Sequence, residues 1–236
     1  MIHTWNFTDW MARPRRPAEF DVAQGGGVTY RQGAHQIDIL RLIGGGLVES
    51  VRAVTFDWHA SRRSIGAHTI FLRFADGAVA TAIYNGYGHL AGSELTAGVG
   101  EWGLPEQPAR RAKSAPALSP EQELAAKRKR ARSAIPSSAP HQPHFGLTVV
   151  SCERGDIRQS PDGLYVYSEQ GREEIAVRND KSPRDLVLDE FAAAIAGRAK
   201  PIHDGRWGLA NLEVCLAAIE SSKRGEEIEL KHQVAV

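Results

Sequence analysis

The sequence predicts an α+β fold: a largely antiparallel, open-faced sheet of about six strands with helices on one face. Two observations lead to this prediction. Segments that alternate apolar and polar residues are joined by tight-turn signals, Asp76-Gly77 and Pro161-Asp162-Gly163, and strands joined by tight turns are antiparallel. Three other segments repeat their apolar residues at helical spacing, one after Gly25 and two near the end of the chain. This combination favours a layer of helices packed on a sheet.

Length and composition limit the class of protein. A chain of 236 residues can bury a sizeable core as one large domain or two small ones. The hydrophobic content of 42% and the charged content of 24% are typical of soluble globular proteins, and the net charge of +1 indicates no particular partner. No apolar run is long enough to span a bilayer, and no signal-peptide pattern is present. We expect Cys152 and Cys215 to be reduced, buried thiols in a cytoplasmic protein.

Four segments predict the N-terminal part of the sheet. Ile2–Asp9 is rich in aromatic and β-branched residues, Val48–Trp58 alternates, and His68–Phe74 returns through a tight turn to Ala78–Tyr84. The first of these begins directly after Met1, with no polar lead-in. We therefore expect the chain to be a fragment whose natural N-terminus lies elsewhere.

The sheet is expected to resume after a long interruption. Phe145–Cys152 is predicted to be a strand, and a meander of short strands follows between Asp156 and Val177. The sheet face away from the helices carries alternating Thr, Val and Tyr, which is too apolar to face only water. We therefore expect a homo-oligomer that forms through the open sheet face.

Two helices are predicted to close the chain. Ser182 caps the first, with Pro183 at its first position and Asp185 in the capping box. Its expected buried stripe is Leu188, Phe191, Ala192 and Ile195. Asp204 caps the second, which is expected to run from about Arg206 to Ser222. Its expected apolar face is Leu209, Leu212, Cys215, Leu216 and Ile219.

Residues 92–143 form a basic, proline-rich excursion from this pattern. Seven of the twelve prolines lie between Pro105 and Pro143, and basic residues outnumber acidic ones by eight to three over Leu104–Pro140. Ser119 and Pro120 can start a short helix. The Lys-Arg-Lys-Arg run raises a nucleic-acid role as an alternative, but without interleaved aromatic residues a solvated helix face is favoured.

The stretch Gly25–Leu42 contains the candidate functional residues. On a continuous helix, Arg31, His35 and Asp38 fall within roughly 60° of one another, and the rest of the circumference is mainly apolar. Two interpretations stay open from the spacing. Asp38 and Arg31 could pair in an internal network with His35 as a bystander, or the strip could line a cleft with His35 as the proton-transfer group.

Other catalytic signatures are missing from the sequence. Neither glycine triplet has the GxGxxG order, and no Walker lysine or Ser/Cys nucleophile pattern is present. The pairs His141/His144 and His35/Asp38 have spacings a metal could use, but no set of three or four ligands converges, so no metal is expected. His35 is therefore the acid/base candidate, and Arg31 with the loop Arg13–Arg16 could hold an anionic group.

Two sequence patterns resemble one known family. The run GGG-x₅-GxHxxDxLR at Gly25–Arg41 and the closing run Phe191–Leu230 resemble the substrate domain of the glucose–fructose oxidoreductase/inositol dehydrogenase/rhizopine catabolism (Gfo/Idh/MocA) family. The resemblance covers nearly the whole chain except the excursion. More narrowly, RPRRP, YRQGAHQIDILRL and FGLTVVSCERGDIRQSPDGLYVY resemble its phthalate 4,5-cis-dihydrodiol dehydrogenase branch.

The resemblance implies an NAD(P)-dependent dehydrogenase whose N-terminal Rossmann domain is absent from this chain. Residues 1–236 would form its C-terminal substrate-binding and oligomerisation domain, inactive alone, and NAD or NADP would be bound mainly by the missing domain. The complete enzyme would oxidise a cis-dihydrodiol carboxylate to a catechol in aromatic catabolism. The alternative is a non-catalytic, self-associating or ligand-sensing module of the same fold.

The resemblance also implies roles for single residues. His35 matches the family's proton-relay position. Many sugar-oxidising members have aspartate four residues before it, where this chain has Arg31, and a guanidinium there suits a substrate carboxylate. Arg15, Arg16 and Asp38 complete the expected substrate-binding set. The expected partners are an anionic cyclic diol, the Rossmann domain and a second copy of the chain, with neither nucleic acid nor membrane.

Overall fold

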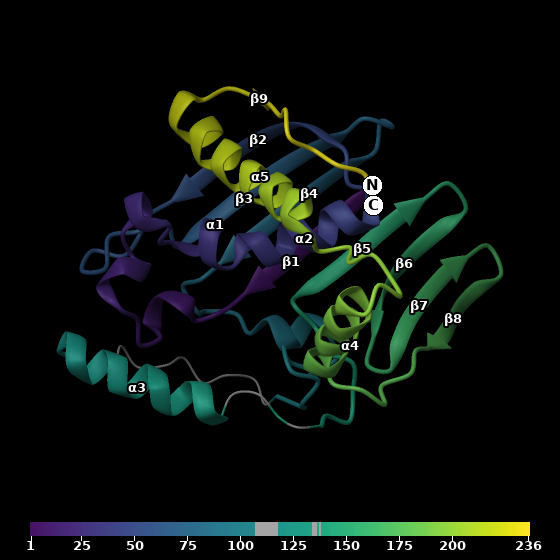
Figure 1. The fold of residues 1–236 in the computed structure, drawn as a ribbon, viewed down its shortest axis with the longest axis horizontal. Helices are drawn as coiled ribbons and strands as arrows, with labels where there is room; N and C mark the ends of the chain where they lie inside the picture. The colour runs from purple at the N-terminus through teal and green to yellow at the C-terminus, as the bar shows by residue number, and fades with distance from the viewer. Residues whose placement is uncertain (107–117, 134–135, 137) are drawn as a thin grey trace.

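The computed structural model describes residues 1–106, 118–133, 136 and 138–236. Within them, nine strands form one sheet in the order β8-β7-β6-β5-β1-β4-β3-β2-β9 (Figure 1). The strands are β1 (Ile2–Phe7), β2 (Val48–Phe56), β3 (Ala67–Phe74), β4 (Val79–Asn85), β5 (Leu147–Cys152), β6 (Gly155–Ser160), β7 (Gly163–Ser168), β8 (Gly171–Ala176) and β9 (Ile228–Glu229). The α+β class is confirmed, and the predicted number of about six strands is wrong. The predicted meander is present as β6, β7 and β8, and the two-residue β9 is too short to show a pattern.

Strand pairing is antiparallel throughout this sheet except between β1 and β4. These two central strands run parallel, with Ile2 opposite Ala80 and Phe7 opposite Asn85. Their carboxyl ends therefore lie at the same edge of the sheet. Residues that follow β1 meet residues that follow β4 at that edge, although they are far apart in the sequence.

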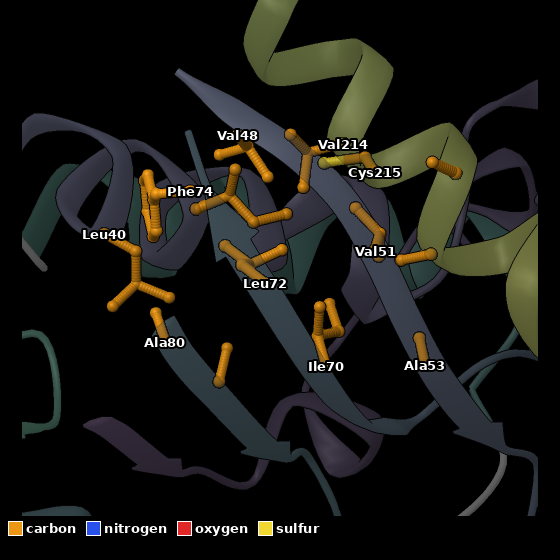
Figure 2. Packing of buried hydrophobic residues seen from close by; sticks show 14 of the residues in the cluster. Leu40, Val48, Val51, Ala53, Ile70, Leu72, Phe74, Ala80, Val214 and Cys215 are labelled. Atoms are coloured by element: carbon orange, nitrogen blue, oxygen red, sulfur yellow. The ribbon is translucent and has the colours of Figure 1, made fainter. Parts of the chain in front are cut away.

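Helices α1 (Val28–Arg31), α2 (Gly33–Ile43) and α5 (Gly205–Arg224) cover one face of the sheet (Figure 1). Their buried side chains pack on alternate residues of β2, β3 and β4, as Figure 2 shows for Leu40, Leu72 and Val214. Each fully buried aliphatic side chain of this kind contributes about 1.5–3 kcal/mol. The predicted layer of helices on one face is confirmed for these three helices.

The predicted continuous helix after Gly27 is broken at Gln32, whose φ of −126° lies outside the helical range. A side-chain carbon at Gly33 would lie 2.9 Å from Cε1 of His68, so the second helix begins where only glycine can approach the sheet. The equal angular spacing expected from Arg31 to Asp38 does not hold across this break. Arg31 belongs to α1, and His35 and Asp38 belong to α2.

Helix α4 (Pro183–Ile195) has the predicted cap but not the predicted burial. The Ser182 side chain accepts a hydrogen bond from the Asp185 N–H, as expected for a capping box. The predicted buried stripe is wrong, because Leu188, Phe191 and Ile195 are 62%, 63% and 73% exposed. Periodicity predicted the helix correctly, but it cannot say whether another element covers the apolar side.

Helix α5 is capped by Asp204, which accepts from Arg206 N and Trp207 N, as predicted. Its buried face differs from the expected one. Cys215 and Ile219 are buried, but Leu209, Leu212 and Leu216 are about half exposed. The rest of the buried face consists of Trp207, Val214 and four small residues, Ala210, Ala217, Ala218 and Ser221. These small residues let α5 approach β2 closely. The close approach is seen in the hydrogen bond that the Ser221 hydroxyl accepts from the Ala53 N–H at 2.9 Å.

Helix α3 (Pro120–Ser133) is 14 residues long, whereas a short helix was expected. Charged groups attach α3 to the basic loop, Arg13–Arg16, and to neighbouring residues. Lys127 lies 2.6 Å from the Glu19 carboxylate, and Glu123 pairs with Arg62 and accepts a hydrogen bond from Arg15 N. Lys127 therefore does not simply face solvent. The remainder of the excursion that falls in 107–117, 134–135 and 137 lies outside the described residues.

The two cysteines differ in their burial. Both cysteines are free, and Cys215 is buried, but Cys152 is exposed, so its predicted burial is wrong.

A cross-sheet row runs through Leu147, Trp5, Ile83, Thr69 and Val54 on the face away from the helices. In the described part of the chain, no helix is long and apolar enough to cross a membrane.

Candidate functional site

His35 lies in the first turn of α2 and is exposed. Its ring meets the edge of Phe145 at a centroid distance of 5.4 Å and an interplanar angle of 67°. Phe145 lies two residues before β5, so this contact joins two segments separated by more than a hundred residues. With both ring nitrogens free of hydrogen bonds to the described residues, the imidazole is available to exchange a proton with a ligand.

Arg31 and Asp38 do not pair with each other. The Arg31 Nε donates to the Gly25 carbonyl at 3.0 Å, and this side chain is half-buried. Asp38 accepts a hydrogen bond from Trp207 Nε1 at 2.6 Å, and its other carboxylate oxygen lies 3.4 Å from His203 Nε2. The internal network that the spacing allowed is therefore not formed. Asp38 holds α2 to the start of α5, which leaves it with structural partners.

The basic loop lies against the start of α1, because the Glu19 carbonyl accepts a hydrogen bond from Gly27 N at 2.8 Å. Arg15 is mostly buried over the Trp10 ring, 4.4 Å from its centroid, and lies 3.5 Å from Glu19. Burial lowers the pKa of Arg15, and the Glu19 carboxylate opposes that shift. Arg16 is half exposed and lies 3.7 Å from the same carboxylate. Arg16 is thus freer than Arg15 to meet a ligand.

His68, on β3, hydrogen-bonds to both helices at the break between α1 and α2. Its Nε2 donates to Gln36 Oε1 at 3.1 Å, and its Nδ1 lies 3.1 Å from the Thr29 hydroxyl, which donates to it. Burial lowers the pKa of His68 to about 3, so the ring is neutral at physiological pH. Each helix thus has one hydrogen bond to the same strand residue, which fixes Arg31 and His35 relative to the sheet.

We expect the stability of the protein to fall in acid because of His68. Its pKa is about 3 when folded and 6.5 in the reference state, so between these values the unfolded chain binds a proton that the folded chain does not. The stabilisation is complete above pH 6.5 and is lost as the pH falls toward 3, by at most about 1.4 kcal/mol per pH unit. Urea unfolding between pH 4 and 7 measures this slope.

The matched variants are His68→Gln and His232→Gln, the second at an exposed histidine. Replacing His68 should flatten the slope of unfolding free energy against pH, whereas replacing His232 should leave it as in the wild type. An unchanged slope in His68→Gln would mean that other groups cause the acid sensitivity.

A cavity of about 220 Å³ opens where the parallel strands β1 and β4 both end. Its lining includes Asn6 and Arg13 near the end of β1, Gly88–Ser93 after β4, and His144 and Phe145 before β5. Phe145 also contacts His35, so one aromatic ring separates the cavity from the candidate proton-transfer residue. No sequence pattern pointed to Asn6, because only the strand order brings these segments together.

The described residues do not form a cofactor or metal site of a familiar kind. The glycine triplet before α1 follows a short 3₁₀ helix, Val22–Gln24, and not a buried parallel strand, so it lacks the context of a dinucleotide-binding turn. Within the described ranges, no three His, Cys, Asp or Glu side chains gather as metal ligands would. His144 Nε2 instead lies 3.0 Å from the Ser160 carbonyl, and His141 lies 2.9 Å from Asp162.

Comparison with known sequences identifies one family. Residues 1–92 match the model of the GFO/IDH/MocA C-terminal domain. A curated relative, the 1-carboxy-3-chloro-3,4-dihydroxycyclohexa-1,5-diene dehydrogenase of Comamonas testosteroni, is 35% identical over 235 residues, which cover 94% of this chain and 58% of the relative. The resemblance predicted from the glycine triplet and the His35 helix is therefore confirmed.

Solved structures share the fold. A protein of Bordetella bronchiseptica RB50, provisionally described as a dehydrogenase, has a TM-score of 0.84 and 36% identity, over 98% of this chain and 62% of its own. The WlbA dehydrogenase of Bordetella pertussis, in complex with NADH and UDP-GlcNAcA, has a TM-score of 0.58 and 18% identity, over 98% and 55%, which shows the fold alone. This chain thus spans less than two thirds of the length of these relatives.

Proposed function

This chain carries the GFO/IDH/MocA C-terminal domain in residues 1–92, and from that premise we propose that it is the substrate-binding part of an NAD(P)-dependent dehydrogenase. The substrate is a cyclic cis-dihydrodiol that bears a carboxylate, of the phthalate 4,5-dihydrodiol kind, and the product is a catechol. The relative from Comamonas testosteroni supports this class, because its name describes a carboxylated dihydroxycyclohexadiene. The observation that carries the proposal is the exposed His35, held on α2 with its ring nitrogens free for a ligand.

The chemistry divides between this chain and the rest of the enzyme. Oxidation of the diol removes a hydride from a carbinol carbon and a proton from its hydroxyl, and the resulting ketone tautomerises to the aromatic catechol. The nicotinamide supplies the hydride acceptor when it is bound. Within this chain, His35 takes the hydroxyl proton, and Arg31 and Arg16 orient the ring through its carboxylate.

The cofactor is assigned to a Rossmann domain outside this chain. The described residues offer no glycine turn after a parallel strand to hold a pyrophosphate, so no residue here is given that role. The apolar side chains exposed on α4 are consistent with a neighbouring domain in the complete protein. We place the protein in the cytoplasm, in keeping with its free cysteines.

The test of the proposed function uses the complete protein with its natural upstream segment. A GxGxxG strand–helix unit encoded before Met1 supports the enzyme. The complete protein is then expected to reduce NAD⁺ or NADP⁺ with a cis-dihydrodiol carboxylate, measured at 340 nm, and the 236-residue chain to show no turnover. A natural start codon at Met1, or no reduction by the complete protein, would favour the non-catalytic ligand-sensing or self-associating module.

Arg31 is expected to set the preference for carboxylated substrates. A charge-assisted hydrogen bond is worth about 1.5–3 kcal/mol, so Arg31→Ala should lower kcat/KM by roughly 10- to 150-fold on a carboxylated dihydrodiol. The same variant should barely affect a dihydrodiol without the carboxylate. Arg52→Ala, at an exposed position on β2, is the matched control. An equal loss on both substrates would show that Arg31 is structural.

Self-association is proposed through the open sheet face. The row of Leu147, Trp5, Ile83, Thr69 and Val54 crosses five neighbouring strands on that face, and Val54 is 49% exposed. Two copies could bury such rows against each other. Light scattering across the micromolar range is expected to give a dimer or larger species. A monomer over that whole range contradicts the proposal.

A further inference from the structure

The cavity at the carboxyl ends of β1 and β4 contains two buried polar groups without a partner among the described residues. Asn6 is 3% exposed, and its Nδ2 makes no hydrogen bond. His144 is 4% exposed, and its Nδ1 makes none. Native proteins rarely leave buried polar atoms unpaired, so such atoms on residues that line a cavity mark a place where a water or a ligand can bind.

The second ring nitrogen fixes the tautomer of His144. Nε2 lies 3.0 Å from the Ser160 carbonyl, which can only accept a hydrogen bond, so Nε2 carries the proton. Burial lowers the pKa of His144, although the Ser160 and Thr96 carbonyls oppose the shift, and the ring is therefore neutral near pH 7. In the neutral ring Nδ1 accepts. Two residues of the cavity lining thus carry one unused donor, on Asn6, and one unused acceptor, on His144.

A hydroxyl group matches this pair, because its oxygen accepts and its proton can be donated. The charged groups of the lining do not favour a multiply charged anion. Arg13 is paired with Asp9 through its Nε, and Glu101 and Glu106 add two further carboxylates to the wall. Phe7 and Phe145 supply apolar walls, and a volume of about 220 Å³ suits one small ring.

We propose that this cavity binds the hydroxyl-bearing edge of a small ring ligand, with hydroxyls that accept from Asn6 and donate to His144. This inference rests on the proposed function, since Phe145 lines the cavity and contacts His35. Asn6 and His144 are therefore specificity residues, and they distinguish a diol from a ring with a single hydroxyl or none.

Binding to the complete protein, without cofactor, tests the inference. The probes for calorimetric titration are 3,4-dihydroxybenzoate and benzoate, which differ only in the two hydroxyls. Asn6→Leu should weaken binding of dihydroxybenzoate about ten-fold and leave benzoate unchanged. It should also raise the Tm, because an unpaired buried amide is replaced by an apolar group of similar size. Ser160→Ala is the control, since its hydroxyl is buried without a partner but outside the cavity lining.

Three results would overturn the assignment: no binding of dihydroxybenzoate by the wild type, wild-type affinity in Asn6→Leu, or an equal loss for both probes. Failure of the proposed function has a different signature. Hydroxyl-dependent binding without reduction of NAD(P)⁺ by any dihydrodiol keeps the cavity assignment and removes the dehydrogenase.

Discussion

Replacing His35 by alanine is expected to lower kcat/KM of the complete enzyme by roughly 10²- to 10⁴-fold, the usual contribution of a positioned acid/base group. The proton of the reacting hydroxyl then has to leave through water. Because His35 is exposed and contacts one described ring, that of Phe145, its loss should leave the fold intact. Steady-state rates of NAD(P)⁺ reduction, with circular dichroism of each variant, measure both parts of this expectation.

The control is His232→Ala, at an exposed histidine in the C-terminal segment. It should keep wild-type kinetics. Normal kcat/KM in His35→Ala would remove His35 from the chemistry and shift the search to the cavity beside Phe145.

Arg41→Met is expected to destabilise the fold by roughly 1–3 kcal/mol or more, since leaving even one buried hydrogen-bond acceptor without its partner costs about 1–3 kcal/mol. Arg41 is fully buried in the last turn of α2. Its guanidinium donates to Gln233 Oε1 at 3.0 Å and to the carbonyls of Trp207, Gly46 and Val234 at 3.3–3.4 Å. It also stacks on the Trp207 ring, 3.9 Å from its centroid. One side chain thus joins α2, α5 and the C-terminal tail.

Chemical unfolding of the complete protein measures this effect through the midpoint concentration of urea. Arg41→Lys should recover part of the loss at most, because an ammonium cannot reproduce the planar fork. Arg52→Met, at an exposed position on β2, should stay within about 0.5 kcal/mol of the wild type. Wild-type stability in Arg41→Met would mean that the cost of burying the cation cancels its hydrogen bonds. Burial already lowers the pKa of Arg41, with Asp38 and Glu213 opposing the shift.

Local signals in the sequence predicted local structure well. The caps at Ser182 and Asp204 and the turn at Asp76-Gly77 are where they were expected, because each depends on a few neighbouring residues. The alternation in β3 likewise predicted the buried face of Ile70, Leu72 and Phe74. The pattern around His35 was sufficient to predict the match of residues 1–92 to the GFO/IDH/MocA C-terminal domain.

Predictions that depended on distant neighbours were less secure. The helical spacing placed Arg31, His35 and Asp38 on one strip, but the close approach of Gly33 to His68 breaks the helix, and Asp38 bonds to Trp207. The apolar period of α4 predicted a buried stripe that remains exposed. Periodicity describes one helix, whereas burial depends on what packs against it.

The sequence by itself determined the fold class, the resemblance to the family and the candidacy of His35, because turn residues, caps and the glycine–histidine pattern are encoded in short segments. The tertiary structure alone decided which groups face a ligand. The parallel pairing of β1 and β4 brings Asn6, Arg13 and His144 to one cavity, and no local pattern encodes that strand order. Sites of this kind are set by long-range packing, in which residues far apart in the chain share one edge of a sheet.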